Sequence, residues 1–233
     1  GVEATLRPLI DLSRYPCRPG PGQKALIQRQ VRDNSRAALQ ALGFYQPVLT
    51  PQWRDADDER CFALTLTVDP GEPTRISALD ITLNGDAADD PAFQRTIDNA
   101  GLEQGQRLRH DRYSRLKQSL QQLLINRGYA EGSVTRHRLE VDRDRREARV
   151  VLHVDSGPRY RFGEITLTGD DQINERLRRA YLQFDSGEPF SNDKLLATQQ
   201  AYLGAGYFSK LETRYYNQRD ELVRRRISTG IRY

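Results

Sequence analysis

The sequence has no methionine, one tryptophan, two cysteines and three histidines among its 233 residues. It also lacks any run of about 18 apolar residues, so no segment is expected to cross a bilayer as a helix. No histidine has a second ligand at a spacing typical of metal sites, and the two cysteines form no Cys-x-x-Cys pair. We therefore expect neither a metal nor a cofactor. The lack of an initiator methionine and of a signal-peptide pattern fits a processed or trimmed chain.

Motifs of catalysis and of nucleic-acid binding are missing as well. The run 20–24 (Gly-Pro-Gly-Gln-Lys) lacks the upstream glycine and the Lys-Ser/Thr pair that a phosphate-binding loop needs, and no nucleophile motif occurs. The net charge is +4, but both signs are mixed along the chain, whereas a nucleic-acid binder concentrates Lys and Arg on one face or tail. We expect no enzyme activity and no nucleic-acid partner.

What the sequence does contain is a three-fold internal repeat. Gly43, Gly128 and Gly206 each end a helix-like stretch, and each is followed by an aromatic residue and a strand-like run. The spacing is roughly 80 residues, and a near-fixed period of this kind indicates an array of similar units. We predict that the three glycines are helix caps. The predicted units are residues 1–70, 71–156 and 157–233.

The middle unit has the most complete pattern. Alternating apolar residues predict strands over 75–83, 133–141 and 148–154, because one face of each strand is apolar. Apolar residues spaced by three and four predict helices over 91–100 and 110–127 between the first two strands. The sequence therefore predicts an α+β unit of order β-α-α-β-β, with two helices packed on a three-stranded mixed sheet.

The outer units follow the same pattern with gaps. The first unit has no opening strand and starts with a helix; its predicted elements are helices 3–12 and 23–42 and strands 45–53 and 61–68. The third unit has no clean last strand, although alternation over 227–233 offers a displaced one. Its other predicted elements are strands 161–168 and 209–216 and helices 174–182 and 192–203.

The two cysteines belong to the first unit. Cys17 lies in the loop between its helices, and Cys61 lies just after its hairpin. If the helices pack antiparallel on one sheet face, both cysteines come to the same end of the unit. A disulfide would then remove about 4 kcal/mol of chain freedom from the unfolded state. Two reduced, partly buried thiols are the alternative.

The hairpins supply the candidate interaction sites. At least one strand of each hairpin should be a sheet edge, and an open edge can accept an extended segment of another chain. The alternative is that these edges stay solvated or are covered by a neighbouring unit. Trp53, if exposed, would be a contact anchor, or else it packs at a strand end. The candidate residues are Val48, Trp53, Val134, Arg136, Arg138, Lys210 and Arg214.

These repeats resemble the POTRA (polypeptide-transport-associated) domain family of the Omp85 superfamily over essentially the whole chain. The run 41–47 (Ala-Leu-Gly-Phe-Tyr-Gln-Pro) is similar to the first domain of the TamA family, and 69–71 and 159–163 carry motifs of the wider family. The resemblance implies a non-catalytic periplasmic scaffold, with a membrane barrel after Tyr233.

It also implies the partners of such a scaffold: an inner-membrane protein of TamB type and, among clients, nascent outer-membrane proteins or autotransporters. The first unit should face the TamB-like protein. An oxidising periplasm favours the Cys17–Cys61 disulfide. The alternative is the periplasmic arm of a BamA-like or two-partner secretion transporter.

Overall fold

The computed structural model describes residues 2–9, 11–13, 15–55, 57, 61–163, 174–205, 212–213 and 227–228. The chain divides into two compact units, and the division runs through the middle repeat. One unit comprises residues 1–83, 90–120 and 134–155, and the other comprises 84–89, 121–133 and 156–233. Within the described ranges, no helix combines the length and the apolar character that a membrane span requires.

The first repeat begins with a helix shorter than the predicted helix over 3–12. Helix α1 spans Val2–Leu6, and a 3-10 turn follows over Arg7–Leu9. Pro8 explains the difference, because it lacks a backbone N–H and its ring collides with the carbonyl four residues earlier. The prediction of a helix continuing to Leu12 is therefore wrong.

Helix α2 spans Pro21–Ala41 and is the long helix of the first repeat. Its start is fixed by Pro21 at the first helical position and by the Gln23 side chain, which accepts a hydrogen bond from the Gly20 N–H. Every fourth residue of one stripe is buried, so this stripe faces the core. The buried residues are Ile27, Val31, Ser35 and Leu39.

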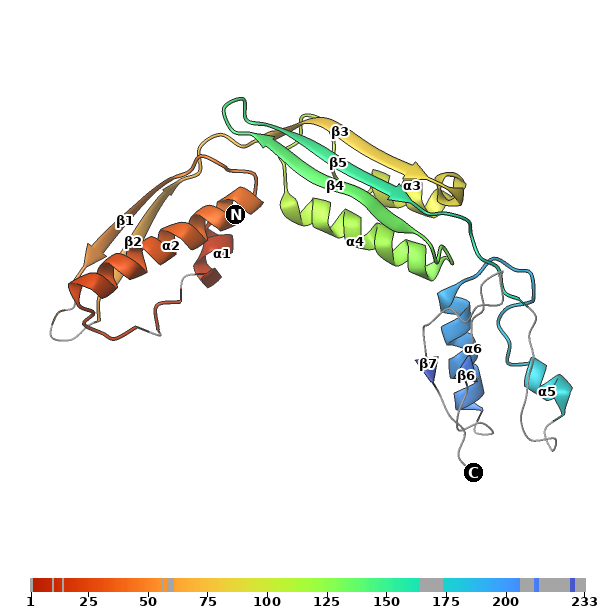
Figure 1. The fold of residues 1–233 in the computed structure, drawn as a ribbon. Coiled ribbons are helices and arrows are strands. Elements are labelled where there is room, and N and C mark those ends of the chain that lie inside the picture. The colour runs from red at the N-terminus through yellow and green to blue at the C-terminus, as the bar shows by residue number, and fades with distance from the viewer. Residues whose placement is uncertain are drawn as a thin grey trace. The chain divides into compact units, whose positions relative to one another are not determined.

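Strands β1 (Val48–Arg54) and β2 (Ala63–Asp69) form the antiparallel hairpin beside α2 (Figure 1). Their register pairs Val48 with Asp69 and Arg54 with Ala63. Alternate residues of both strands are half-buried and the others are exposed, as expected for a sheet with one covered face. A cluster of Leu6, Leu39 and Phe44, with Leu49 and Val68 against it, joins helices to hairpin.

The middle repeat holds the three-stranded sheet. Its elements are β3 (Arg75–Asn84), a 3-10 turn (Asp86–Asp89), α3 (Pro91–Asp98), α4 (His110–Asn126), β4 (Ser133–Asp142) and β5 (Glu147–Asp155). The strand order is β3-β5-β4, so β5 is central. Figure 1 shows β3 and β5 running in the same direction and β4 in the opposite one, so the sheet is mixed, as predicted.

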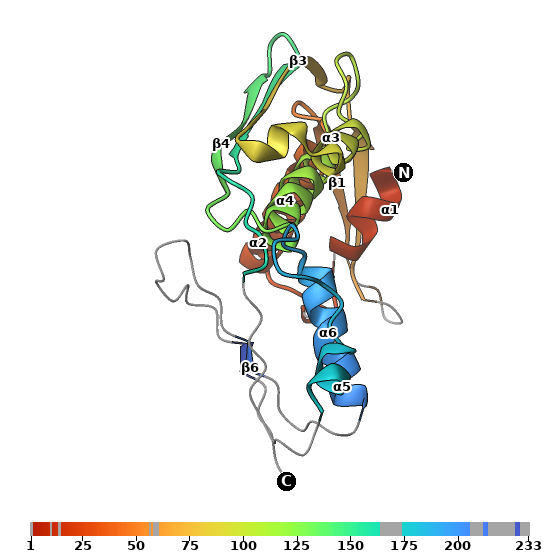
Figure 2. The same ribbon diagram turned by 90° about the vertical axis from the view of Figure 1, so that its right-hand side faces the viewer.

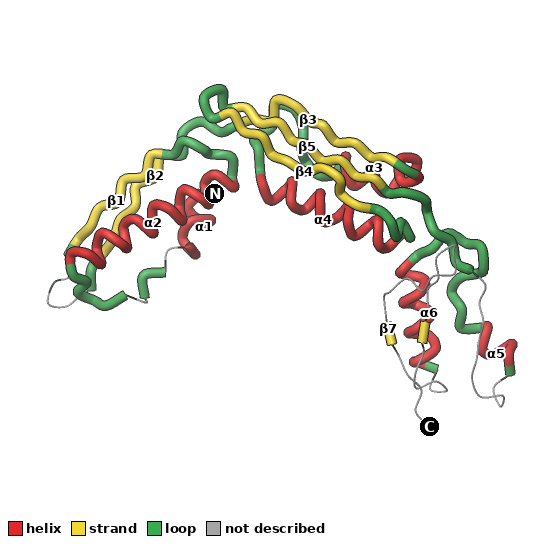
Figure 3. The backbone as a smooth tube through the Cα atoms, in the orientation of Figure 1, coloured by secondary structure: helices red, strands yellow, loops and turns green. Residues whose placement is uncertain are grey.

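Helices α3 and α4 lie on one face of this sheet, as the two ribbon views and the tube show (Figures 1, 2 and 3). Asp90 caps α3 by accepting a hydrogen bond from the Ala92 N–H at 3.0 Å. The apolar core between helices and sheet is made by one stripe of α4, Phe93 of α3 and the inward residues of β5. Its fully or almost fully buried members include Phe93, Leu116, Leu120, Ala148, Val150 and Leu152.

The third repeat contributes α5 (Glu175–Arg179), α6 (Asn192–Gly204) and two short strands, β6 (Glu212–Thr213) and β7 (Ile227–Ser228). Strands β6 and β7 pair antiparallel. Helix α5 is shorter than the predicted 174–182. Most of the predicted strands over 161–168 and 209–216 lies outside the described residues.

Candidate interaction surfaces

Strand β4 is an edge of the middle sheet, because it pairs only with β5 among the described strands. Val134 is half-buried, whereas residues 135–138 are all exposed. The predicted candidates Arg136 and Arg138 therefore lie on an open edge. The corresponding candidates of the third repeat, Lys210 and Arg214, are outside the described residues.

The first hairpin presents a different surface. Val48 is 61% exposed at the start of β1. Trp53 is half-buried and stacks on Phe62 with ring centroids 4.4 Å apart, while its indole N–H donates to Asp55 at 2.9 Å. Pro51 lies within β1 and provides no backbone N–H for a further strand. The tryptophan thus packs at the strand end, and Val48 is the more accessible of the two candidates.

Cys17 and Cys61 are joined in a disulfide in the structure. The bond ties the loop between α1 and α2 to the segment just before β2, so Cys61 lies between the two hairpin strands and not after the hairpin as predicted. A backbone hydrogen bond runs alongside it, from the Phe62 N–H to the Cys17 carbonyl at 3.4 Å. This loop and the hairpin therefore meet at one end of the repeat.

The repeated glycines end their helices in one shared geometry. Gly43 has φ +90° and Gly128 has φ +83°, conformations that favour glycine. After α2, the Phe44 N–H bonds to the Leu39 carbonyl at 2.8 Å. After α4, the Tyr129 N–H bonds in the same way to the Leu124 carbonyl at 2.9 Å. The pattern is that of a Schellman motif, with an aromatic residue after the glycine. Gly206 lies outside the described residues.

Gly43 also contacts the next repeat. Its carbonyl accepts a hydrogen bond from the Thr74 N–H at 2.8 Å. A Cβ added to Gly43 would lie 2.3 Å from the Leu108 carbonyl oxygen, closer than real Cβ atoms approach. The guanidinium of Arg107 lies 5.2 Å from the centre of the Phe44 ring. Glycine is thus required twice here, by its own φ and by the neighbouring backbone.

Gly128 makes the equivalent contact one repeat later. Its carbonyl accepts from the Tyr160 N–H at 2.8 Å, and an added Cβ would lie 2.6 Å from the Cβ of Phe190. The guanidinium of Arg159 lies 5.8 Å from the centre of the Tyr129 ring. We call the contacts of Gly43 with Thr74 and Leu108 the first junction, and those of Gly128 with Tyr160 and Phe190 the second junction. The two junctions are similar, as are the sequences around the two glycines.

The backbone ladder behind each junction is also shared. In both junctions, the residue whose N–H bonds to the glycine carbonyl also uses its own carbonyl to accept a hydrogen bond from an N–H in the loop before the next long helix. The first junction has Leu108 N–H to Thr74 (2.9 Å), Ile76 N–H to Gln106 (2.8 Å) and Gly105 N–H to Ile76 (2.7 Å). The second has Phe190 N–H to Tyr160 (3.0 Å), Phe162 N–H to Glu188 (2.8 Å) and Gly187 N–H to Phe162 (2.7 Å). Sequence reasoning did not predict these contacts; the recurrence of Gly105 and Gly187 before the long helices was the available signal.

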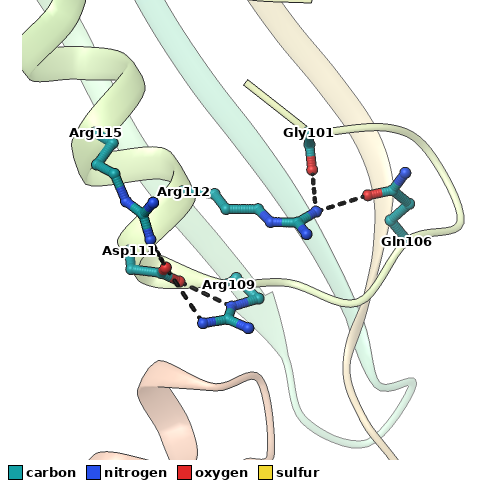
Figure 4. A network of polar contacts seen from close by, with 6 residues as sticks. All are labelled: Gly101, Gln106, Arg109, Asp111, Arg112 and Arg115. Atoms are coloured by element: carbon teal, nitrogen blue, oxygen red, sulfur yellow. Dashed lines mark hydrogen bonds and ion pairs between the residues drawn. The ribbon is translucent and has the colours of Figure 1, made fainter. Parts of the chain in front are cut away.

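A polar network fixes the loop that carries Leu108 (Figure 4). Arg112 of α4 reaches back to the Gly101 carbonyl at 2.6 Å and to the Gln106 side chain at 3.1 Å. Asp111, in the first turn of α4, accepts hydrogen bonds from Arg109 and Arg115. Burial opposes ionisation of Asp111, but these two arginines hold its pKa below the usual range. The network therefore holds the loop in place behind the first junction.

Tyr45 and His110 form a side-chain contact at the same junction. The Tyr45 hydroxyl lies 2.6 Å from Nε2 of His110. Burial lowers the pKa of His110, and the nearby Asp111 carboxylate opposes this shift. Burial also raises the pKa of Tyr45. Both groups are therefore neutral near pH 7.

No cluster of three or more His, Cys, Asp or Glu side chains suited to a metal ion occurs in the described parts of the chain. His153 and Arg149 of β5 instead share Asp80 of β3, each at 2.9 Å. The hydrogen bonds from His153 and then Arg149 lower the pKa of Asp80. These contacts form a cross-strand polar network on the sheet, with an ion pair between Arg149 and Asp80.

Comparison with known proteins identifies the repeats. A family model described as POTRA domain TamA domain 1 matches residues 2–70. The POTRA family model, described as surface antigen variable number repeat, matches residues 78–157 and 160–227.

Solved structures of related domains are also similar to this chain. POTRA domains 3–5 of BamA from Haemophilus influenzae are 16% identical, with a TM-score of 0.44, over 86% of this chain and 77% of theirs. POTRA domains 1–3 of Omp85 from Anabaena are 15% identical, with a TM-score of 0.35, over 93% and 83% of the two chains.

POTRA domains are periplasmic, non-enzymatic scaffold domains of outer-membrane proteins, and they mediate protein–protein interactions. The family model matches well over half of the chain. The chain therefore belongs to the POTRA family and consists of tandem POTRA repeats.

Proposed function

We propose that this chain is the periplasmic scaffold of an outer-membrane protein and autotransporter assembly module of TamA type. Its first repeat would bind an inner-membrane partner of TamB type. The match of residues 2–70 to the first TamA domain supports this assignment over a BamA-like or two-partner secretion arm.

The open edge of β4 is the observation that carries the proposed client binding. Residues 135–138 are exposed, and β4 has a neighbour on one side only among the described strands. An extended client segment added here would gain main-chain hydrogen bonds, with little demand on its sequence. That tolerance suits a scaffold that handles many β-rich clients.

Site-specific photo-crosslinking in the periplasm tests the two surfaces separately. Probes at Val48 and Gln52 examine β1, and probes at Thr135 and His137 examine β4. A probe at Gln118, on the exposed side of α4, is the matched control in the same repeat as β4. We expect a TamB-like product from β1 and β-barrel client products from β4. The proposal would be contradicted if neither strand gave a TamB-like or β-barrel product. It would also be contradicted if the probe at Gln118 gave the same products to the same extent.

A further inference from the structure

The charged side chains of β4 change sign along the strand, from basic to acidic. Because β4 is a sheet edge, this order affects which strands can pair with it. Arg136, Arg138, Glu140 and Asp142 occupy every second position, so they lie on the same face of the strand. All four are exposed. The first half of this face is therefore basic and the second half is acidic.

Nothing in the described structure satisfies three of these charges. The side chains of Arg136, Arg138 and Glu140 have no hydrogen bond or ion pair with any described residue, whereas the Asp142 carboxylate accepts from the N–H groups of Asp144 and Arg145 and lies 3.8 Å from the Arg145 guanidinium. The strand contains neither proline nor glycine, so its outer row of backbone groups is uninterrupted. The edge can therefore accept another strand, and three of its four charges lack partners among the described residues.

We propose that β4 pairs antiparallel with β4 of a second copy of this chain, with Leu139 opposite Leu139 of the partner at the two-fold axis. This register places Arg138 opposite Glu140 and Arg136 opposite Asp142, and the symmetry repeats both contacts. Four opposite-charge pairs form and no like charges meet directly. Opposite charges at directly paired positions stabilise a sheet, and like charges destabilise it.

The same charges exclude the neighbouring registers. An in-register parallel pairing would put each arginine opposite an arginine. An antiparallel pairing centred on Arg138 or on Glu140 would place that residue opposite its own copy. A shift by one residue would bring the exposed face of one strand against the less exposed face of the other. Only the pairing centred on Leu139 avoids all these conflicts.

The opposite face of β4 agrees with this register. Leu139 and Val141 are half-buried on that face, beside the exposed His137. In the dimer, Leu139 meets its own copy and Val141 meets His137, so apolar surface is covered on the side away from the charges. The interface is one strand wide, which places it among weak, transient contacts.

This inference rests on the open edge used in the proposed function. A second copy of the chain would compete with client strands for that edge. A dimer through β4 covers the groups that a client strand would use. Self-pairing would therefore protect the edge while no client is present.

The test is a charge swap measured by sedimentation equilibrium on the 233-residue chain. We expect a reversible monomer–dimer equilibrium for the wild type. Arg138→Glu places Glu opposite Glu140, and Glu140→Lys places Lys opposite Arg138, so each variant alone should dimerise about tenfold more weakly or worse. An equimolar mixture restores all four pairs and should recover dimers of the wild-type strength.

Recovery in the mixture also shows that both variants are folded. Arg32→Glu, an exposed charge reversal on α2, is the matched control and should leave dimerisation unchanged. A wild-type chain that stays monomeric at all concentrations, or a mixture that fails to recover, would overturn the inference. Client crosslinking from Thr135 without any dimer would overturn self-pairing and leave the proposed function standing.

Discussion

Replacing Gly43 with alanine is expected to open the first junction. The added Cβ would lie 2.3 Å from the carbonyl oxygen of Leu108. Because that neighbour is backbone, no side-chain rotation relieves the contact, and the loop before α4 must move away. Thr74 then loses the carbonyl to which its N–H is bonded at 2.8 Å.

Gly105→Ala is the control that separates strain from contact. Gly105 has φ +85°, close to the +90° of Gly43, but no atom lies within 4 Å of its added Cβ. A non-glycine residue in a left-handed conformation costs about 1–2 kcal/mol, and both variants bear this cost. Overpacking adds about 1–3 kcal/mol at Gly43 alone. The difference between the two variants measures the junction.

Amide hydrogen exchange followed by NMR is the assay. The Thr74 amide reports the bond to Gly43, and the Ile76 amide reports the ladder within the next repeat. A loss of about 1–3 kcal/mol corresponds to exchange about 5- to 150-fold faster at Thr74 in Gly43→Ala. We expect a smaller change at Ile76 in the same variant.

Equal behaviour of the two variants would refute this reasoning. If Gly43→Ala and Gly105→Ala lowered stability alike and left Thr74 equally protected, the close approach to Leu108 would have no energetic consequence. Gly43 would then be only the cap of α2.

Two further predictions concern the first repeat and its junction. Burial lowers the folded-state pKa of His110, so the contribution of the neutral imidazole to the free energy of unfolding is complete above about pH 6.5 and is lost as the pH falls toward the folded pKa. His110→Gln should therefore make the free energy of unfolding less dependent on pH between about pH 7 and 5, as measured by chemical denaturation. An unchanged pH dependence in this variant would contradict the prediction. Cys17 and Cys61 close a loop of sequence separation 44, so replacing both with serine should lower the unfolding free energy of the first repeat by up to about 4 kcal/mol, while exchange at the Ile76 amide stays as in the wild type; unchanged denaturation of the first repeat would contradict this.

The regular elements of the middle repeat could be predicted because the local spacing of apolar residues determines them. Alternation gave β4 and β5 within about a residue of their observed bounds, and spacing by three and four gave α4. Local patterns also have local failures. The helix predicted over 3–12 ignored Pro8, and β3, predicted with one buried face, has only Ile76 fully buried.

The junction contacts could not be predicted from the same patterns, because they join residues 25 or more positions apart. The bond from Thr74 to Gly43 depends on where two repeats meet, and no periodicity within either repeat encodes that position. The sequence did identify Gly43 as a helix cap. That cap also forms a contact between repeats, and only the structure reveals this second role.

A second junction allows the same reasoning to be tested independently. Gly128→Ala brings the new Cβ to 2.6 Å from the Cβ of Phe190, whereas Gly187, at φ +82°, has open space around an added Cβ. If the junction is a property of the repeat, Gly128→Ala should expose the Tyr160 amide to exchange, and Gly187→Ala should not. The neighbour at Gly128 is a side chain, which yields more easily than the backbone beside Gly43, so the effect should be smaller. A response at the first junction alone would mean that the shared ladder does not make the two contacts equivalent.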